Sequence, residues 1–193
     1  MKNSAGSSER GPEYAIMPIR LTNAAIRSWQ IADAESLVLH ANNRNISRNL
    51  RDRFPFPYTF NDAKAFISFA LNQKPETVFA IAVDGSAVGG IGLMLHDDVE
   101  RVAAEIGYWL AEPFWGRGIM SEAVRAMTQY AIRTHQLTRV YALPFEWNRA
   151  SCRVLEKAGY TLEGRLRRSA IKNGRVIDQF LYAFVVSESD SAG

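Results

Sequence analysis

The chain has 193 residues, of which 47% are hydrophobic and 11% aromatic, enough for the core of a single domain. A formal net charge of +3 argues against an obligatory nucleic-acid partner, and a single cysteine, Cys152, excludes a disulfide framework within the chain. The sequence lacks a run of about eighteen apolar residues, so no membrane span is predicted and a cytoplasmic protein is expected.

The two ends of the chain differ in composition from the rest. Residues 1–13 are polar and rich in Gly and Ser, and they lack the apolar segment of a secretory signal. Residues 1–18 are expected to form a disordered leader. Residues 19–187 are predicted to form a single domain, followed by a tail at residues 188–193.

The pattern of apolar residues predicts a strand, two helices, three strands, a helix, a strand, a helix and two strands. The expected strands lie at residues 25–30, 78–83, 87–95, 106–110, 139–143, 160–168 and 176–186. The expected helices lie at residues 32–42, after Asn61, from 119 to 133, and at 148–158. This order predicts an α/β protein with helices on the faces of a sheet.

Local signals support these elements. Asp84-Gly85 and Asn173-Gly174 each predict a tight turn between two antiparallel strands. Asn61 is the expected N-cap of the second helix. Residues 43–58 are polar and basic and end in FPFPY, where two prolines favour an extended, rigid loop.

The rest of the predicted domain is organised around the stretch from Glu105 to Arg133. An apolar strand leads through a glycine-containing loop into a long amphipathic helix. The N-terminus of a helix carries unpaired N–H groups and a partial positive charge, and Gly116 and Gly118 allow a bulky anion to approach the backbone. The loop is therefore interpreted as a pyrophosphate cradle, the alternative being an ordinary strand-to-helix turn. The lysine of a Walker loop and the third glycine of a dinucleotide fingerprint are both missing.

Four segments carry a resemblance to a known family. They read FPFPYT, WGRGIM, NRASCRVLEKAGYTLEGRLR and KNGRVIDQFLYAF. Residues 19–186 thereby resemble the GNAT acetyltransferases, and within them the RimJ/RimL-like branch. The resemblance implies a mixed, mostly antiparallel twisted sheet of about seven strands with helices on both faces. It also implies transfer of an acetyl group from acetyl-CoA to a primary amine, without a metal.

The resemblance assigns a coenzyme site around the glycine loop. The diphosphate is expected on the backbone N–H groups from Gly116 to Ser121, and the pantetheine arm along the strand edge. Met120 departs from the small residue usual at its place, which either crowds the coenzyme or reshapes the start of the helix. The expected coenzyme-binding residues are Trp109, Leu110, Ala111, Gly116, Arg117, Gly118, Ile119, Met120, Ser121 and Asn148.

Several of these residues have equally ordinary explanations. Arg117 is either a phosphate contact or a solvated loop arginine, and Asn148 either reaches the coenzyme or caps a helix. A basic stripe of Arg149, Arg153 and Lys157 either meets the adenosine phosphates or faces solvent.

Glu105 and Ser151 are the expected catalytic residues. Glu105 is the candidate base that deprotonates the amine through water, or else a structural carboxylate paired with an arginine on the next strand. Ser151 is the candidate proton donor to the departing thiolate, or else a first-turn helix residue. Leu155 occupies the place where some relatives carry a tyrosine acid. Without either group, catalysis would depend on proximity alone.

Other chemically active residues are given structural roles. His40, His96 and His135 have no metal-ligand spacing, so no metal is expected. Cys152 is predicted to be packed, and Asp178 to form structural hydrogen bonds.

The acceptor is the least determined part. The resemblance places its groove beside Phe54, Phe56 and Tyr58, facing a basic segment at residues 165–175. The acceptor amine is then a protein N-terminus or a small molecule, handled by a monomer or a homodimer. The alternatives from other classes are a non-catalytic acyl-CoA-binding sensor or scaffold and an RNA-binding module.

Overall fold

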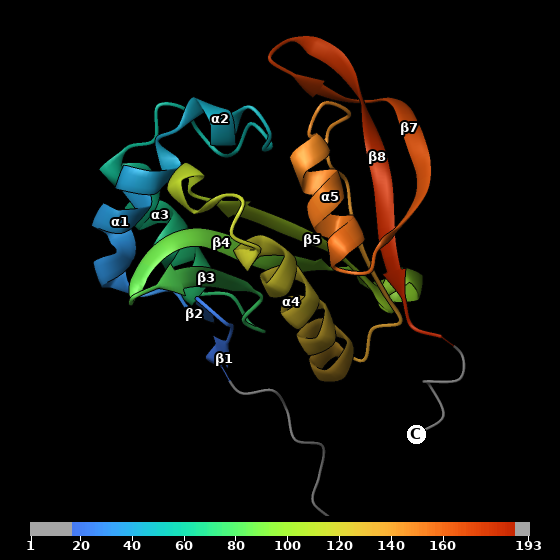
Figure 1. Cartoon of the computed structure of the whole chain (residues 1–193), viewed down its shortest axis with the longest axis horizontal. Coiled ribbons are helices and arrows are strands. Elements are labelled where there is room, and N and C mark those ends of the chain that lie inside the picture. Colours follow the sequence, from blue (N-terminus) through green and yellow to red (C-terminus); the bar gives the residue numbers. More distant parts are fainter. Residues whose placement is uncertain (1–16, 188–193) are drawn as a thin grey trace, which may run out of the picture.

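The computed structural model describes residues 17–187, so the predicted tail and nearly all of the predicted leader lie outside the described residues. Eight strands form one sheet in the order β1-β2-β3-β4-β5-β6-β8-β7 (Figure 1). Neighbouring strands are antiparallel except β5 and β6, which are parallel. The predicted mixed, mostly antiparallel α/β fold is confirmed, with one strand more than expected.

The strands are β1 (Ile19–Arg20), β2 (Ala25–Ser28), β3 (Val78–Val83), β4 (Ser86–Leu95), β5 (Ala103–Leu110), β6 (Arg139–Ala142), β7 (Thr161–Lys172) and β8 (Arg175–Val185). The α-helices are α1 (Ala34–Ala41), α2 (Arg44–Ser47), α3 (Phe60–Leu71), α4 (Ile119–His135) and α5 (Arg149–Lys157). Three short 3₁₀ helices are η1 (Ile31–Asp33), η2 (Asp98–Glu100) and η3 (Glu112–Phe114).

Two details of the predicted elements were wrong. The segment expected to be loop contains the short helix α2, which begins because the Asn43 side chain accepts a hydrogen bond from the Asn45 N–H at 2.7 Å. Helix α3 begins after Thr59 rather than Asn61. Thr59 and Asp62 form a reciprocal capping box, in which each side chain accepts from the other residue's N–H.

The helices cover the two faces of the sheet separately (Figure 1). Helices α4 and α5 pack on one face in a core cluster that includes Ile106, Val124 and Leu155. Helices α1 and α3 pack on the other face in a second cluster that includes Leu37 and Ile67. Side chains alternate along a strand, so successive residues of β5 face these two layers in turn.

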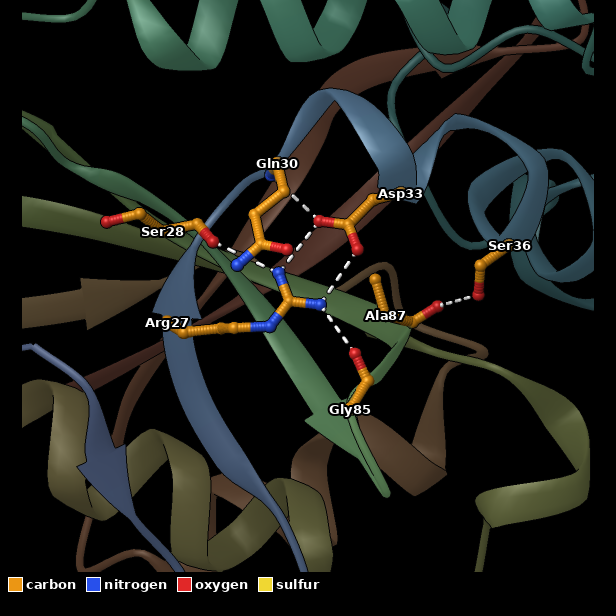
Figure 2. Close-up of polar contacts among 7 residues, drawn as sticks. All are labelled: Arg27, Ser28, Gln30, Asp33, Ser36, Gly85 and Ala87. Atoms are coloured by element: carbon orange, nitrogen blue, oxygen red, sulfur yellow. Dashed lines mark hydrogen bonds and ion pairs between the residues drawn. The ribbon is translucent and has the colours of Figure 1, made fainter.

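A buried ion pair fixes α1 to the sheet (Figure 2). The Arg27 guanidinium donates to both carboxylate oxygens of Asp33, at 2.7 and 2.8 Å, and also to the backbone carbonyl of Gly85. The Gln30 N–H donates to the same carboxylate at 2.8 Å. The Arg27–Asp33 pair therefore joins β2, η1 and the β3–β4 turn.

Candidate functional site

The cleft opens where the parallel strands β5 and β6 separate. Only three residue pairs join them, ending with Glu105 opposite Tyr141. Strand β5 continues to Leu110, whereas β6 ends at Ala142. The space between them belongs to a cleft of about 1470 Å³ that is lined from both faces of the sheet.

The exposed edge of β5 is formed by alternate residues. Ala103 accepts from His96 and Ala111 donates to Val88, both on the β4 side, at 3.2 and 2.8 Å. Antiparallel pairing alternates, so Tyr108 and Leu110 direct their backbone groups toward the cleft. The carbonyl of Leu110 already accepts from the Trp115 indole N–H at 2.7 Å.

This pattern corrects part of the predicted pantetheine edge. Of Trp109, Leu110 and Ala111, only Leu110 offers a backbone N–H on the cleft side. Trp109 lines the cleft through its side chain instead, and Ala111 is fully buried outside the lining. The alternating direction of the backbone groups along the strand places the N–H of Tyr108, rather than that of Ala111, on the cleft side.

The glycine loop forms an open cradle at the start of α4. Gly116 and Gly118 have φ of 76° and 80°, and a Cβ added to either would meet nothing within 4 Å. Among residues 17–187, no side chain caps this helix. Its first N–H groups are therefore available to an anion, as the phosphate of a coenzyme requires.

Met120 is largely buried at the start of α4. Ile119 and Met120 are only 4% and 7% exposed and belong to the core cluster beneath α4, and both also line the cleft. Their packing holds the start of the helix in place. The second expectation for Met120, that it shapes the start of the helix, is the one that its burial supports.

The cations near the cradle come mainly from α5. The Arg117 guanidinium lies 5.2 Å from the centre of the Phe114 ring, and Arg117 does not line the cleft. Arg153 and Lys157 do line it, whereas Arg149 stacks over Phe180 at 5.3 Å. Two of the three residues of the predicted basic stripe thus reach the site.

Asn148 and Ser151 meet β5 at the N-terminus of α5. The Asn148 side-chain oxygen accepts from the Ser151 N–H at 3.2 Å, so Asn148 is an N-cap and also lines the cleft. The Ser151 hydroxyl lies 2.8 Å from the Tyr108 hydroxyl. Burial raises the pKa of Tyr108, so it remains a neutral hydroxyl able to donate or accept.

Glu105 lies on the opposite face of β5 from Tyr108. The Arg51 guanidinium donates to both carboxylate oxygens, and the Glu105 side chain is 15% exposed. The alternative to the base role paired Glu105 with an arginine on the next strand, whereas Arg51 comes from the segment after α2. Because 54 residues separate the pair, no local pattern indicated it.

Two of the three aromatic residues predicted for the acceptor line the cleft. Phe54 and Tyr58 line the cleft, and the Phe54 ring centre lies 5.0 Å from that of Tyr58 and 5.7 Å from that of Trp109. Phe56 lies outside it, 45% exposed beneath the Arg44 guanidinium, so its predicted position in the groove was wrong. Residues 52–57 form turns and bends rather than an extended strand, so the spacing of two residues does not keep Phe56 on the same side as Phe54 and Tyr58.

The segment 44–58 is tied across the cleft by side chains. Lys172 donates to Asp52 at 2.7 Å, and the Trp147 indole donates to Asn49 at 3.1 Å. The Asn45 amide donates to Glu112, and hydrogen bonds from Asn43 and Asn45 lower the pKa of Glu112. The segment thus spans β5, β7 and η3 above the opening.

The remaining predicted residues have structural surroundings. Cys152 is buried, and that burial raises its pKa. Asp178 accepts from the Arg168 N–H at 2.7 Å and from Arg165 at 2.6 Å, which lowers its pKa and confirms its structural role. Within residues 17–187, no three potential ligands gather around a metal site, and no helix is long and apolar enough to cross a membrane.

The sequence is similar to those of known and putative N-acetyltransferases. A family model described as an acetyltransferase (GNAT) domain matches residues 23–161. The putative ribosomal N-acetyltransferase YdaF of Bacillus subtilis is 38% identical over 105 residues, and this match covers 54% of the chain and only 57% of YdaF. The probable N-acetyltransferase YjcK of the same species is 33% identical over 156 residues, covering 77% of the chain and 86% of YjcK.

The fold has solved counterparts. RimL, a ribosomal L7/L12 alpha-N-protein acetyltransferase solved in complex with coenzyme A, superposes with a TM-score of 0.76. The superposition covers 86% of this chain and 96% of RimL at 22% identity. Similarity at this level of identity reflects a shared fold.

Proposed function

This chain belongs to the GNAT family of N-acetyltransferases, and on that premise we propose that it transfers the acetyl group of acetyl-CoA to a primary amine. The observation that carries the proposal is the continuity of the cleft. One cavity reaches from the glycine cradle, through the opening between β5 and β6, to Glu105 on the other face. A thioester and an amine approaching from opposite faces would meet in that opening.

The coenzyme half fits an anionic, extended ligand. The N–H groups from Gly118 to Ser121 would hold the diphosphate, and Arg153 and Lys157 would add positive charge. The edge of β5 at Tyr108 and Leu110 would pair with the amide groups of the pantetheine arm. When bound, acetyl-CoA supplies an activated acyl group as a thioester.

Glu105 is the proposed base. Its carboxylate lines the cleft on the acceptor side, close enough to the opening to accept a proton from the amine through water. The Arg51 guanidinium holds the carboxylate in one orientation. An α-amine, with a pKa of about 7.7–8.0, needs less of this help than a lysine amine.

Ser151 is the proposed proton donor to the leaving thiolate, oriented by Tyr108. The Tyr108–Ser151 contact fixes the direction of the serine hydroxyl at the coenzyme side of the opening. Tyr108→Phe is expected to lower turnover about tenfold by removing this orientation. The matched change Tyr160→Phe, which removes a buried hydroxyl paired with Thr128, should not affect turnover. Equal effects of the two changes would exclude the role.

The proposed acceptor is a protein N-terminal amine, in line with the name of RimL, an alpha-N-protein acetyltransferase of ribosomal L7/L12. The purified protein should be incubated with acetyl-CoA, peptides and small amines, and the products measured by intact mass. A gain of one acetyl group on the peptide α-amine supports the proposal, and acetylation confined to small amines would replace the acceptor class. Tight acetyl-CoA binding without any acetylated product would indicate a sensor and overturn the transferase function.

A further inference from the structure

Gly107 leaves the backbone of a central strand exposed at one position. It lies in the middle of β5, and yet it is exposed, and a Cβ added to it would meet nothing within 4 Å. A position so far from the edge of a sheet is ordinarily covered by a helix or a loop. Open space above it therefore marks a groove on this face.

A second glycine lies on the neighbouring strand. Gly92 of β4 is directly opposite Gly107, and such pairs share one face of a sheet. A Cβ added to Gly92 would lie 3.1 Å from the Thr77 carbonyl oxygen, so the open space lies above Gly107. We call this pair the glycine floor. It lies between Glu105 and Trp109, which are about 13 Å apart along the strand. Both glycines line the cleft, so the floor is continuous with the proposed catalytic opening.

Several large apolar side chains line the same cleft as the glycine floor. They are Phe66 and Phe69 of α3 together with Val78, Met94 and Trp109, and polar residues such as Gln73, Lys74 and Thr77 also line it. Phe69 and Met94 remain 54% and 40% exposed, although both side chains are large and apolar. Incompletely covered apolar surface inside a cleft is typical of a binding site for an apolar group.

The inference rests on the proposed transfer to an amine. We propose that the glycine floor receives a bulky apolar group attached beside the acceptor amine, and so selects amines that carry one. The amine would lie next to Glu105, and the apolar group over Gly107 against Phe69 and Met94. An aromatic or branched N-terminal residue of a peptide and an arylalkylamine both have this chemistry.

The selectivity test compares amines that differ only in the neighbouring group. One series uses peptides with Phe, Leu or Met first against peptides with Gly or Ser first, and the other uses phenylethylamine against ethylamine. The kcat/KM should favour the bulky apolar member by about 30-fold, within the range for a hydrophobic pocket that distinguishes substrates by size. Whichever series is acetylated identifies the source of the amine.

Gly107→Leu should then fill the groove. The kcat/KM for the bulky amines should fall about 100-fold, because their reacting nitrogen is displaced. Gly164→Leu is the matched control, since Gly164 is also a strand glycine with nothing within 4 Å of an added Cβ, and it lies outside the cleft. It should keep the preference. Phe69→Ser, a change at a half-exposed wall residue, should reduce the preference without depending on the fold of β5.

The possible failures are distinguishable. Acetylation that favours small or charged amines would overturn this inference and leave the transferase function standing. A preference for bulky amines that survives both Gly107→Leu and Phe69→Ser would also overturn it. The absence of acetylated product from every amine, with acetyl-CoA bound, would remove the proposed function and this inference together.

Discussion

The two halves of the cleft are built differently. The proposed coenzyme half, on the side of α4 and α5, consists mainly of backbone: a glycine turn, a helix N-terminus and a strand edge. The acceptor half, on the side of α1 and α3, consists of side chains held by long-range contacts such as Arg51–Glu105 and Asp52–Lys172. A backbone site suits one invariant ligand, whereas side-chain contacts can be exchanged to suit different acceptors.

The largest effect is expected from a substitution that disrupts acetyl-CoA binding at the glycine loop. Gly118→Glu places a carboxylate in the diphosphate cradle, where like charges repel at a cost of several kcal/mol. The dissociation constant for acetyl-CoA, measured by calorimetry, should rise about 1000-fold, which corresponds to about 4 kcal/mol. The proposed coenzyme site predicts this loss whatever the acceptor is.

Gly174→Glu is the matched control. Gly174 also has a positive φ, 74°, and a Cβ added to it would meet nothing, but it lies in the β7–β8 turn away from the cleft. It should bind acetyl-CoA as the unchanged protein does. Equal affinity of the two variants would mean that the diphosphate does not bind at Gly118.

The next effect concerns the support of the acceptor half. Asp33→Ala leaves the Arg27 guanidinium, whose side chain is only 15% exposed, without its carboxylate. The free energy of unfolding from urea denaturation should fall by about 3 kcal/mol. Glu163→Ala, which breaks a more exposed pair with Arg139, should cost about 1 kcal/mol or less. An equal loss in both variants would show that the Arg27–Asp33 pair is no more important than a surface pair.

The division between a half built from backbone and a half built from side chains also explains which features the sequence could predict. The glycine turn, the start of α4 and both hairpins follow from local patterns, because glycine conformation and helix periodicity act over a few residues. The Arg51–Glu105 and Asp52–Lys172 pairs join residues 54 and 120 positions apart, which no local pattern specifies. Tyr108 lay within a predicted strand and Ser151 was predicted as a proton donor, but their contact depends on the placement of α5 beside β5, which no local pattern specifies.

A third prediction tests the chemistry between the two halves. Glu105→Gln keeps the shape of the side chain but removes the proposed base, so kcat should fall about 100-fold while the affinity for acetyl-CoA stays unchanged. Steady-state kinetics across a pH series, paired with calorimetry, measures both quantities. Glu163→Gln, at another carboxylate paired with an arginine, is the control. Unchanged turnover at every pH would return Glu105 to a structural role.

The smallest expected effect concerns the tether of the segment 44–58. Lys172→Met retains the apolar stem of a side chain that is only 7% exposed but removes its ion pair with Asp52, which is 68% exposed. Because one partner is solvated, the pair should contribute less than about 1 kcal/mol, so KM for the acceptor should rise about fivefold or less. The affinity for acetyl-CoA should not change, since the tether lies on the acceptor side.

Lys64→Met is the control for that change. Lys64 lies on α3 over the Phe60 ring, 4.7 Å from its centre, and outside the cleft. Its loss should leave both constants as they are. If Lys172→Met instead weakened acetyl-CoA binding as much as acceptor binding, the two halves would be coupled through the segment 44–58. The contrast between a backbone-built coenzyme site and an independent side-chain-built acceptor site would then be wrong.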